Sequence, residues 1–129
     1  MFTIAQIESA HYKVKSGADF PAYIREIKNL GVRAFETFAC DSHTNYFGKN
    51  DFKTTSEPKF PKLQIAKELD SNQFRLDLKS HQNAKTDYMT FCVNCAKSGI
   101  AKWVCDLEEM TCTYFDFAGN KVLTEKIAE

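Results

Sequence analysis

The residues best suited to chemistry are a group of cysteines in the last third of the chain and a histidine in a polar turn. Cys92 and Cys95 have the Cys-x-x-Cys spacing of redox pairs and metal knuckles. One hypothesis is therefore a thiol-dependent redox or metal-binding enzyme, in which Cys105 and Cys112 would be further metal ligands. The spacing of these four cysteines matches none of the usual structural zinc patterns.

The other interpretation of Cys92 and Cys95 is that both are core residues. They lie about a turn beyond Asp87, the expected cap of their helix, whereas a helix dipole lowers a thiol pKa chiefly in the first turn. The internal repeat described below aligns them with Ile24 and Ile27 on an apolar helix face. Because a buried free cysteine behaves as a small hydrophobe, we favour core thiols and keep the enzyme as the alternative.

His43 lies in the polar turn Asp41-Ser42-His43-Thr44, after a predicted strand over residues 32–40. Loops often carry functional residues, and an imidazole that titrates near neutral pH can act as an acid, a base or a metal ligand. The plainer interpretation is a solvated histidine among turn-forming residues. The residues that we predict to bind a ligand are Asp41, His43, Tyr46 and Trp103.

The elements that position these residues occur twice. Moved back by 68 positions, residues 86–117 fall on residues 18–49 without a gap and match them in character. Each segment is predicted to form a helix closed by a glycine, Gly31 or Gly99, and then strands. Glycine suits these positions because it takes the positive φ that ends a helix at little cost. The pattern predicts two copies of one unit.

The predicted fold class is α+β, with two ααβββ-like repeats. Within each repeat the spacing of apolar residues changes from helical to alternating. A single domain over residues 1–129 is expected, with halves at about 1–57 and 62–129. The two halves are expected to join into one antiparallel sheet with the helices packed on one face.

Capping residues predict where the helices begin. Thr3 and Gln6 have the spacing of a capping box, in which each side chain satisfies the other's backbone N–H. Ser71 or Asn72 is expected to cap the third helix, and Asp87 the fourth.

The composition predicts a globular protein without a strong overall charge. Hydrophobic residues make up 43% of the 129 residues and can supply a core. The 17 basic and 17 acidic residues cancel, which argues against nucleic acid or an anionic membrane as a partner. No basic segment or long apolar run marks a signal peptide or a membrane span, so we expect a cytoplasmic protein with reduced thiols.

Several motifs are similar to those of a known family. They lie at residues 14–24, 36–38, 41, 43–44, 46–48, 85–88, 92, 95–99 and 110–114. Through them the chain resembles, over nearly its full length, a small bacterial family of unknown function whose members are often labelled phage envelope proteins. The family brings no established catalytic residues, so the resemblance implies no site and no cofactor.

These observations together predict a small binding or assembly module. A groove between the repeat halves is the expected site for an unknown small ligand or protein partner. Exposed strand edges invite pairing with another chain, so a homodimer is a further hypothesis. The alternative function is the thiol-dependent enzyme of Cys92 and Cys95.

Overall fold

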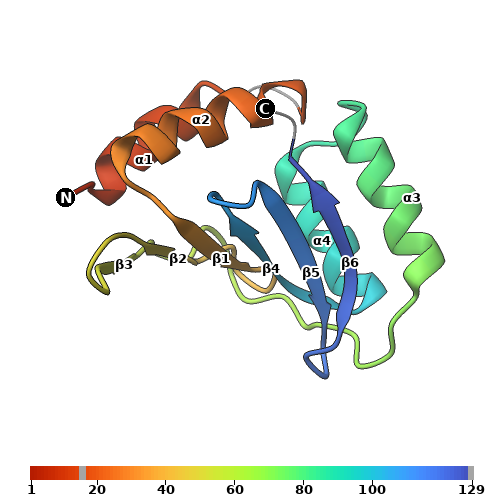
Figure 1. Ribbon diagram of the computed structural model, residues 1–129. Helices are drawn as coiled ribbons and strands as arrows, with labels where there is room; N and C mark the ends of the chain where they lie inside the picture. Colours follow the sequence, from red (N-terminus) through yellow and green to blue (C-terminus); the bar gives the residue numbers. More distant parts are fainter. Residues whose placement is uncertain (15–16, 128–129) are drawn as a thin grey trace.

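The structure is a computed structural model that describes residues 1–14 and 17–127. In these residues it has four α-helices, one short 3-10 helix and six strands (Figure 1). The helices are α1 (Ile4–Tyr12), η1 (Gly17–Asp19), α2 (Phe20–Leu30), α3 (Ser71–Gln82) and α4 (Tyr88–Ser98). The strands are β1 (Ala34–Phe38), β2 (Thr44–Phe47), β3 (Lys53–Thr55), β4 (Ile100–Asp106), β5 (Thr111–Asp116) and β6 (Lys121–Lys126).

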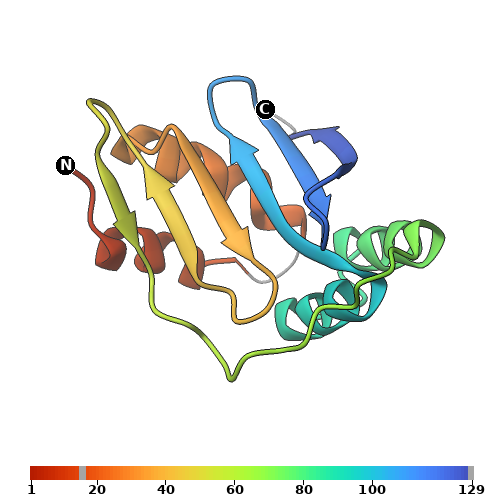
Figure 2. The same ribbon diagram turned by 90° about the horizontal axis from the view of Figure 1, so that it is seen from below.

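The six strands form one sheet in the order β3-β2-β1-β4-β5-β6 (Figure 2). Every neighbouring pair is antiparallel. The first three strands of the chain make one half of the sheet and the last three make the other, and the halves join where β1 pairs with β4. The predicted α+β class and the single antiparallel sheet are therefore confirmed.

Elements of the two halves keep the predicted offset of 68 positions. Helix α4 begins and ends 68 residues after α2. Each helix closes on a left-handed glycine, Gly31 with φ 112° and Gly99 with φ 89°. Glu36 and Val104, which lie opposite each other at the centre of the β1–β4 pairing, are also 68 positions apart. These are matches of element position, and the internal repeat stays a prediction.

The sheet has one face buried under the helices and one face open. Helices α1 and α2 lie over one half of the sheet, and α3 and α4 over the other (Figure 1). On the open face Lys102 Nζ and Glu36 Oε2 form an ion pair at 2.9 Å. The buried face carries alternate residues of the four central strands: Phe35, Thr37, Thr44, Tyr46, Trp103, Cys105, Cys112 and Tyr114.

Two of the predicted helix starts are confirmed. Thr3 and Gln6 form a complete capping box at the start of α1. The Asp87 carboxylate accepts the backbone N–H of Thr90 at 2.8 Å and caps α4. In the part of the chain that the structure describes, no helix combines the length and apolar character needed to cross a bilayer.

Helix α3 starts one or two residues earlier than predicted. Asp70, rather than Ser71 or Asn72, is the N-cap, because its carboxylate accepts the backbone N–H of Gln73 at 3.0 Å. The backbone N–H of Asp70 also donates to the carbonyl of Ser98 at 2.8 Å. This bond to the end of α4 fixes the chain just before α3, and local sequence does not reveal it.

The end of α4 offers a test of this packing. A Cβ on Gly99 would lie 2.6 Å from the carbonyl oxygen of Glu68, and φ is 89° there. Gly99→Ala should therefore lower the free energy of unfolding by about 2–4 kcal/mol, combining backbone strain with overpacking. Gly119→Ala is the matched control, because Gly119 has the same φ and no atom within 4 Å of an added Cβ.

The control should lose only the strain contribution, about 1–2 kcal/mol. Urea unfolding of both variants beside the wild type measures the difference. Equal losses in the two variants would contradict the close approach of Gly99 to Glu68.

Candidate functional site

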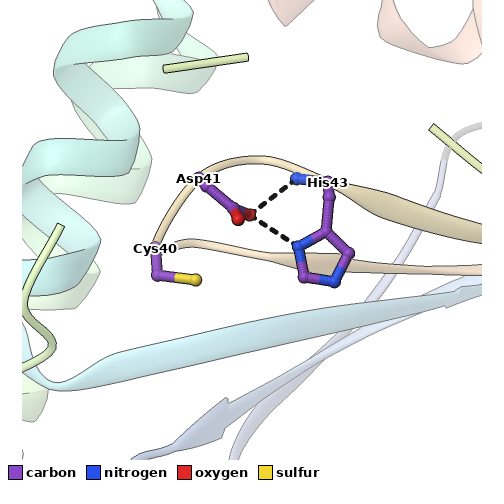
Figure 3. Close-up of side chains that lie close together, drawn as sticks. All are labelled: Cys40, Asp41 and His43. Atoms are coloured by element: carbon purple, nitrogen blue, oxygen red, sulfur yellow. Dashed lines mark hydrogen bonds and ion pairs between the residues drawn. The ribbon is translucent and has the colours of Figure 1, made fainter. Parts of the chain in front are cut away.

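The turn between β1 and β2 brings Cys40, Asp41 and His43 together (Figure 3). Their potential metal-binding atoms all lie within 4.8 Å of one another. In residues 1–14 and 17–127 no other set of three or more His, Cys, Asp or Glu side chains is as closely grouped. All three residues are partly exposed, so the group can be reached from solvent.

Asp41 holds His43 in one orientation. Its Oδ1 accepts the backbone N–H of His43 at 3.0 Å and lies 2.6 Å from His43 Nδ1. A carboxylate can only accept, so we assign the imidazole proton to Nδ1. The ring also stacks on Phe38, with centroids 4.5 Å apart and planes 9° from parallel. Nε2 lies on the side of the ring away from the Asp41 carboxylate and the Cys40 sulfur (Figure 3).

The protonation of the site follows from these contacts. Burial alone would raise the pKa of Asp41, but hydrogen bonds from the backbone N–H and the imidazole of His43 outweigh it and lower the pKa. Burial, the negative charge of Asp41 and a hydrogen bond to it raise the pKa of the Cys40 thiol, against a smaller opposing effect of Lys62. At neutral pH the site therefore holds a carboxylate beside a protonated thiol.

The rest of the fold anchors this turn. Ser42 has φ 63°, a left-handed conformation that is uncommon for a residue other than glycine. Its hydroxyl hydrogen-bonds the hydroxyl of Tyr88, the first residue of α4, at 2.6 Å. The backbone N–H groups of Lys59 and Leu63 donate to carbonyls of the turn at 2.8 and 2.6 Å. Contacts from α4 and from the connection after β3 thus hold the turn in place.

The structure separates the four residues predicted to bind a ligand. Asp41 and His43 lie together in the turn, as described above. Tyr46 and Trp103 lie on the buried face of the sheet, 9% and 7% exposed. They pack among other aromatic rings, such as Phe35 beside Tyr46 and Tyr114 beside Trp103. The structure therefore gives both residues a place in the core.

The cysteines of the alternative hypothesis are all buried. Cys92 and Cys95 are 0% and 1% exposed on the inner side of α4. Burial raises the pKa of Cys92 to about 11 and that of Cys95 well above its ordinary value. Cys105 and Cys112 face each other across β4 and β5, with their sulfurs 3.2 Å apart. Among the described residues these four cysteines do not gather into a metal-ligating group of three.

Two open hollows of the surface lie away from the turn. One, of about 460 Å³, is lined by residues 68–72. The other, of about 300 Å³, lies between α3 and β6. Both are lined entirely by residues of the second half of the chain, so neither corresponds to the predicted groove between the halves.

Cys40 is the site residue that the sequence interpretation missed. It was expected to end a strand, but β1 stops at Phe38 and Cys40 already belongs to the turn. A signal was present in the sequence, since Cys40-x-x-His43 encloses Asp41 and puts three metal-ligating residue types within four positions. The strand pattern of residues 32–40 runs through Cys40 and hides this spacing.

The fold and the site define a small α+β protein with a six-stranded antiparallel sheet and a Cys-Asp-His turn. The chain belongs to the family described as "Protein of unknown function (DUF1398)", whose family model matches residues 8–126. This confirms the resemblance to a small family of unknown function; the description names no phage envelope role. A comparison with curated proteins gives no match.

The Asp41–His43 contact predicts how stability depends on pH. Because the folded pKa of Asp41 is lowered, its stabilisation is complete above the ordinary carboxyl pKa and is lost as pH falls through the folded value. Wild type should therefore unfold at higher urea concentration than Asp41→Asn at neutral pH, and the difference should shrink below about pH 4.

Asp51→Asn removes an exposed carboxylate from the following turn and serves as the matched control. Its unfolding should follow that of the wild type at each pH. A stability gap between wild type and Asp41→Asn that stays constant with pH would show that the carboxylate charge is not what holds His43.

Proposed function

We propose that the protein binds a transition-metal ion of the zinc class through Cys40, Asp41 and His43. The observation that supports this is the convergence of a thiol, a carboxylate and an imidazole within 4.8 Å on one turn. Zinc takes these three donor types at about 2.0–2.3 Å, so donors around one ion lie roughly 3–4 Å apart. Small side-chain rotations would bring the three groups to that spacing.

The donor set favours one group of metals over another. Magnesium and calcium prefer oxygen ligands, and only Asp41 offers them here. A thiolate and an imidazole favour zinc and neighbouring transition metals. Three protein ligands would leave a fourth position for water or a further ligand, an arrangement found at catalytic zinc sites and not at closed structural ones.

His43 would bind the metal through Nδ1. This is the nitrogen beside Asp41, whereas Nε2 lies on the far side of the ring (Figure 3). The metal would replace the proton on Nδ1, and the neutral imidazole would then carry its proton on Nε2. Stacking on Phe38 keeps the ring plane fixed during this change.

The same geometry argues against Cys40 as a nucleophile activated by His43. A general base accepts the proton of its nucleophile, as the histidine of a catalytic triad does through Nε2. Here the sulfur lies away from Nε2, and the pKa of the Cys40 thiol is raised. We therefore place Cys40 as a metal ligand.

This proposal agrees with the predicted binding module but puts the ligand at a turn and not in a groove between the halves. The site lies on a turn of the first half, and neither Tyr46 nor Trp103 takes part in it. An enzyme that used Cys92 and Cys95 would first have to expose two buried thiols. The homodimer and the cytoplasmic location stay predictions that are independent of the metal.

Calorimetric titration of chelator-stripped protein with zinc tests the proposal. Wild type should show one site, and Cys40→Ser, Asp41→Asn and His43→Gln should each weaken binding by at least about tenfold, since each removes a ligand. His81→Gln alters a partly buried histidine in the last turn of α3 and is the matched control, with affinity as in wild type. Magnesium should give no binding heat.

Two results would refute the metal site. One is the absence of zinc binding to folded wild type. The other is equal affinity in Cys40→Ser and wild type, which would place any bound ion elsewhere.

The affinity for zinc should also rise with pH. The raised pKa of Cys40 means that the metal must displace a proton from the thiol at neutral pH. Between about pH 6 and 8, each pH unit should increase the affinity up to about tenfold. The same titration repeated across this range measures the slope, and a slope unchanged in Cys40→Ser would exclude the thiolate as a ligand.

A further inference from the structure

A second pair of side chains, apart from the turn, has a geometry suited to covalent chemistry. Cys105 on β4 and Cys112 on β5 are direct register partners, and their sulfurs lie 3.2 Å apart. Directly opposite residues of antiparallel strands have Cα atoms about 4.5–5.5 Å apart. That spacing falls within the roughly 4.4–6.8 Å that disulfides span.

We infer that Cys105 and Cys112 are a redox modification site that forms a reversible cross-strand disulfide. A movement of about 1 Å would bring the sulfurs to bonding distance. The backbone already aligns the two residues, so the sheet would not have to rearrange. This inference does not depend on the metal proposed at Cys40.

The first half of the sheet provides an internal comparison. Thr37 and Thr44 occupy the positions 68 residues before Cys105 and Cys112, and their hydroxyls hydrogen-bond at 2.8 Å. Both pairs are buried and join neighbouring strands. Hydroxyls cannot be oxidised to a cross-link, whereas thiols can, so the second half alone has this chemistry.

The reaction is a thiol–disulfide exchange with a low-molecular-weight disulfide such as oxidised glutathione. The thiolate of one cysteine attacks the reagent, whose S–S bond breaks and releases one reduced molecule. The second cysteine attacks the mixed disulfide and releases another. The S–H bonds of Cys105 and Cys112 are lost, one S–S bond forms between them, and their two electrons and two protons reduce the reagent to two thiols.

Access controls the rate of this reaction. Cys105 is 0% exposed and Cys112 5% exposed, so a reagent must wait for local opening. Strand β6 alone separates β5 from the edge of the sheet. Opening of β6 would therefore expose Cys112 first, and oxidation should be slow but reversible.

Peptide mapping tests the inference directly. Trypsin cuts after Lys102 and Lys121, so Cys105 and Cys112 fall in one peptide, residues 103–121. After incubation in glutathione buffers of rising oxidised fraction and alkylation, this peptide should be unalkylated and lighter by two hydrogen atoms. The tryptic peptide over residues 86–97 carries Cys92 and Cys95 and should stay alkylated at both.

A second experiment exposes the buried thiols to the oxidant by unfolding the chain. The reduced chain is unfolded and refolded in the same buffers, and the same peptide is expected to carry the disulfide. Reductant should restore both thiols, and the thermal midpoint should be higher in the oxidised form because the cross-link restricts the unfolded chain.

Variants separate this pair from its neighbours. Cys105→Ser and Cys112→Ser should abolish the mass loss, whereas Cys95→Ser and Cys40→Ser should keep it. The inference is overturned if the peptide over residues 103–121 stays doubly alkylated in both experiments, or if Cys112 pairs with Cys95 instead. The first result would leave Cys105 and Cys112 as a hydrogen-bonded core pair, and the second would assign Cys112 to a different disulfide, whatever the outcome of the zinc titration.

Discussion

Strands β1 and β4 pair edge to edge at the centre of the sheet, and the arrangement of the core follows from that register. Glu36 lies opposite Val104, which places Thr37 beside Trp103 and Phe35 beside Cys105 on the buried face. A slip of one residue would turn every one of these side chains to the other face. The pairing also joins two three-stranded halves into one surface for all four helices.

The end of β1 determines where the proposed site lies. Strand β1 ends at Phe38, whose ring on the open face supports the imidazole of His43. The chain then turns through Ser42, which the hydroxyl of Tyr88 ties to α4. Asp41 then lies beside His43. The sheet fixes one side of this turn through Phe38, and α4 fixes the other through Tyr88. The site is thus built by a turn of the first half and held by contacts from the second.

Sequence patterns predicted the parts of the fold that local chemistry decides. The glycines Gly31 and Gly99 marked the ends of two helices, and the spacing between them revealed the 68-residue offset that the elements keep. The patterns placed the cap of α3 too late, because Asp70, Ser71 and Asn72 are all of capping type and only the bond from the Asp70 carboxylate to the backbone N–H of Gln73 selects among them. The bond from the backbone N–H of Asp70 to Ser98 is tertiary, and local sequence carries no record of it.

Of the four residues predicted to bind a ligand, two lie together in the structure and two lie in the core. Asp41 and His43 lie together in the predicted polar turn, and their binding of a ligand stays a prediction. The alternating pattern of apolar residues predicted strands at Tyr46 and Trp103, but it does not show which face of the sheet the helices cover. Both side chains lie on the face that the helices cover. Cys40 was missed because a strand pattern continued to it, although the chain had already left the sheet.

Diffraction at the zinc absorption edge, from crystals of the full chain grown with zinc, tests the proposed function most directly. One anomalous peak is expected at about 2.0–2.3 Å from Cys40 Sγ, an Asp41 carboxylate oxygen and His43 Nδ1. A turn without a peak in zinc-saturated crystals, or a peak bound by other residues, would contradict it.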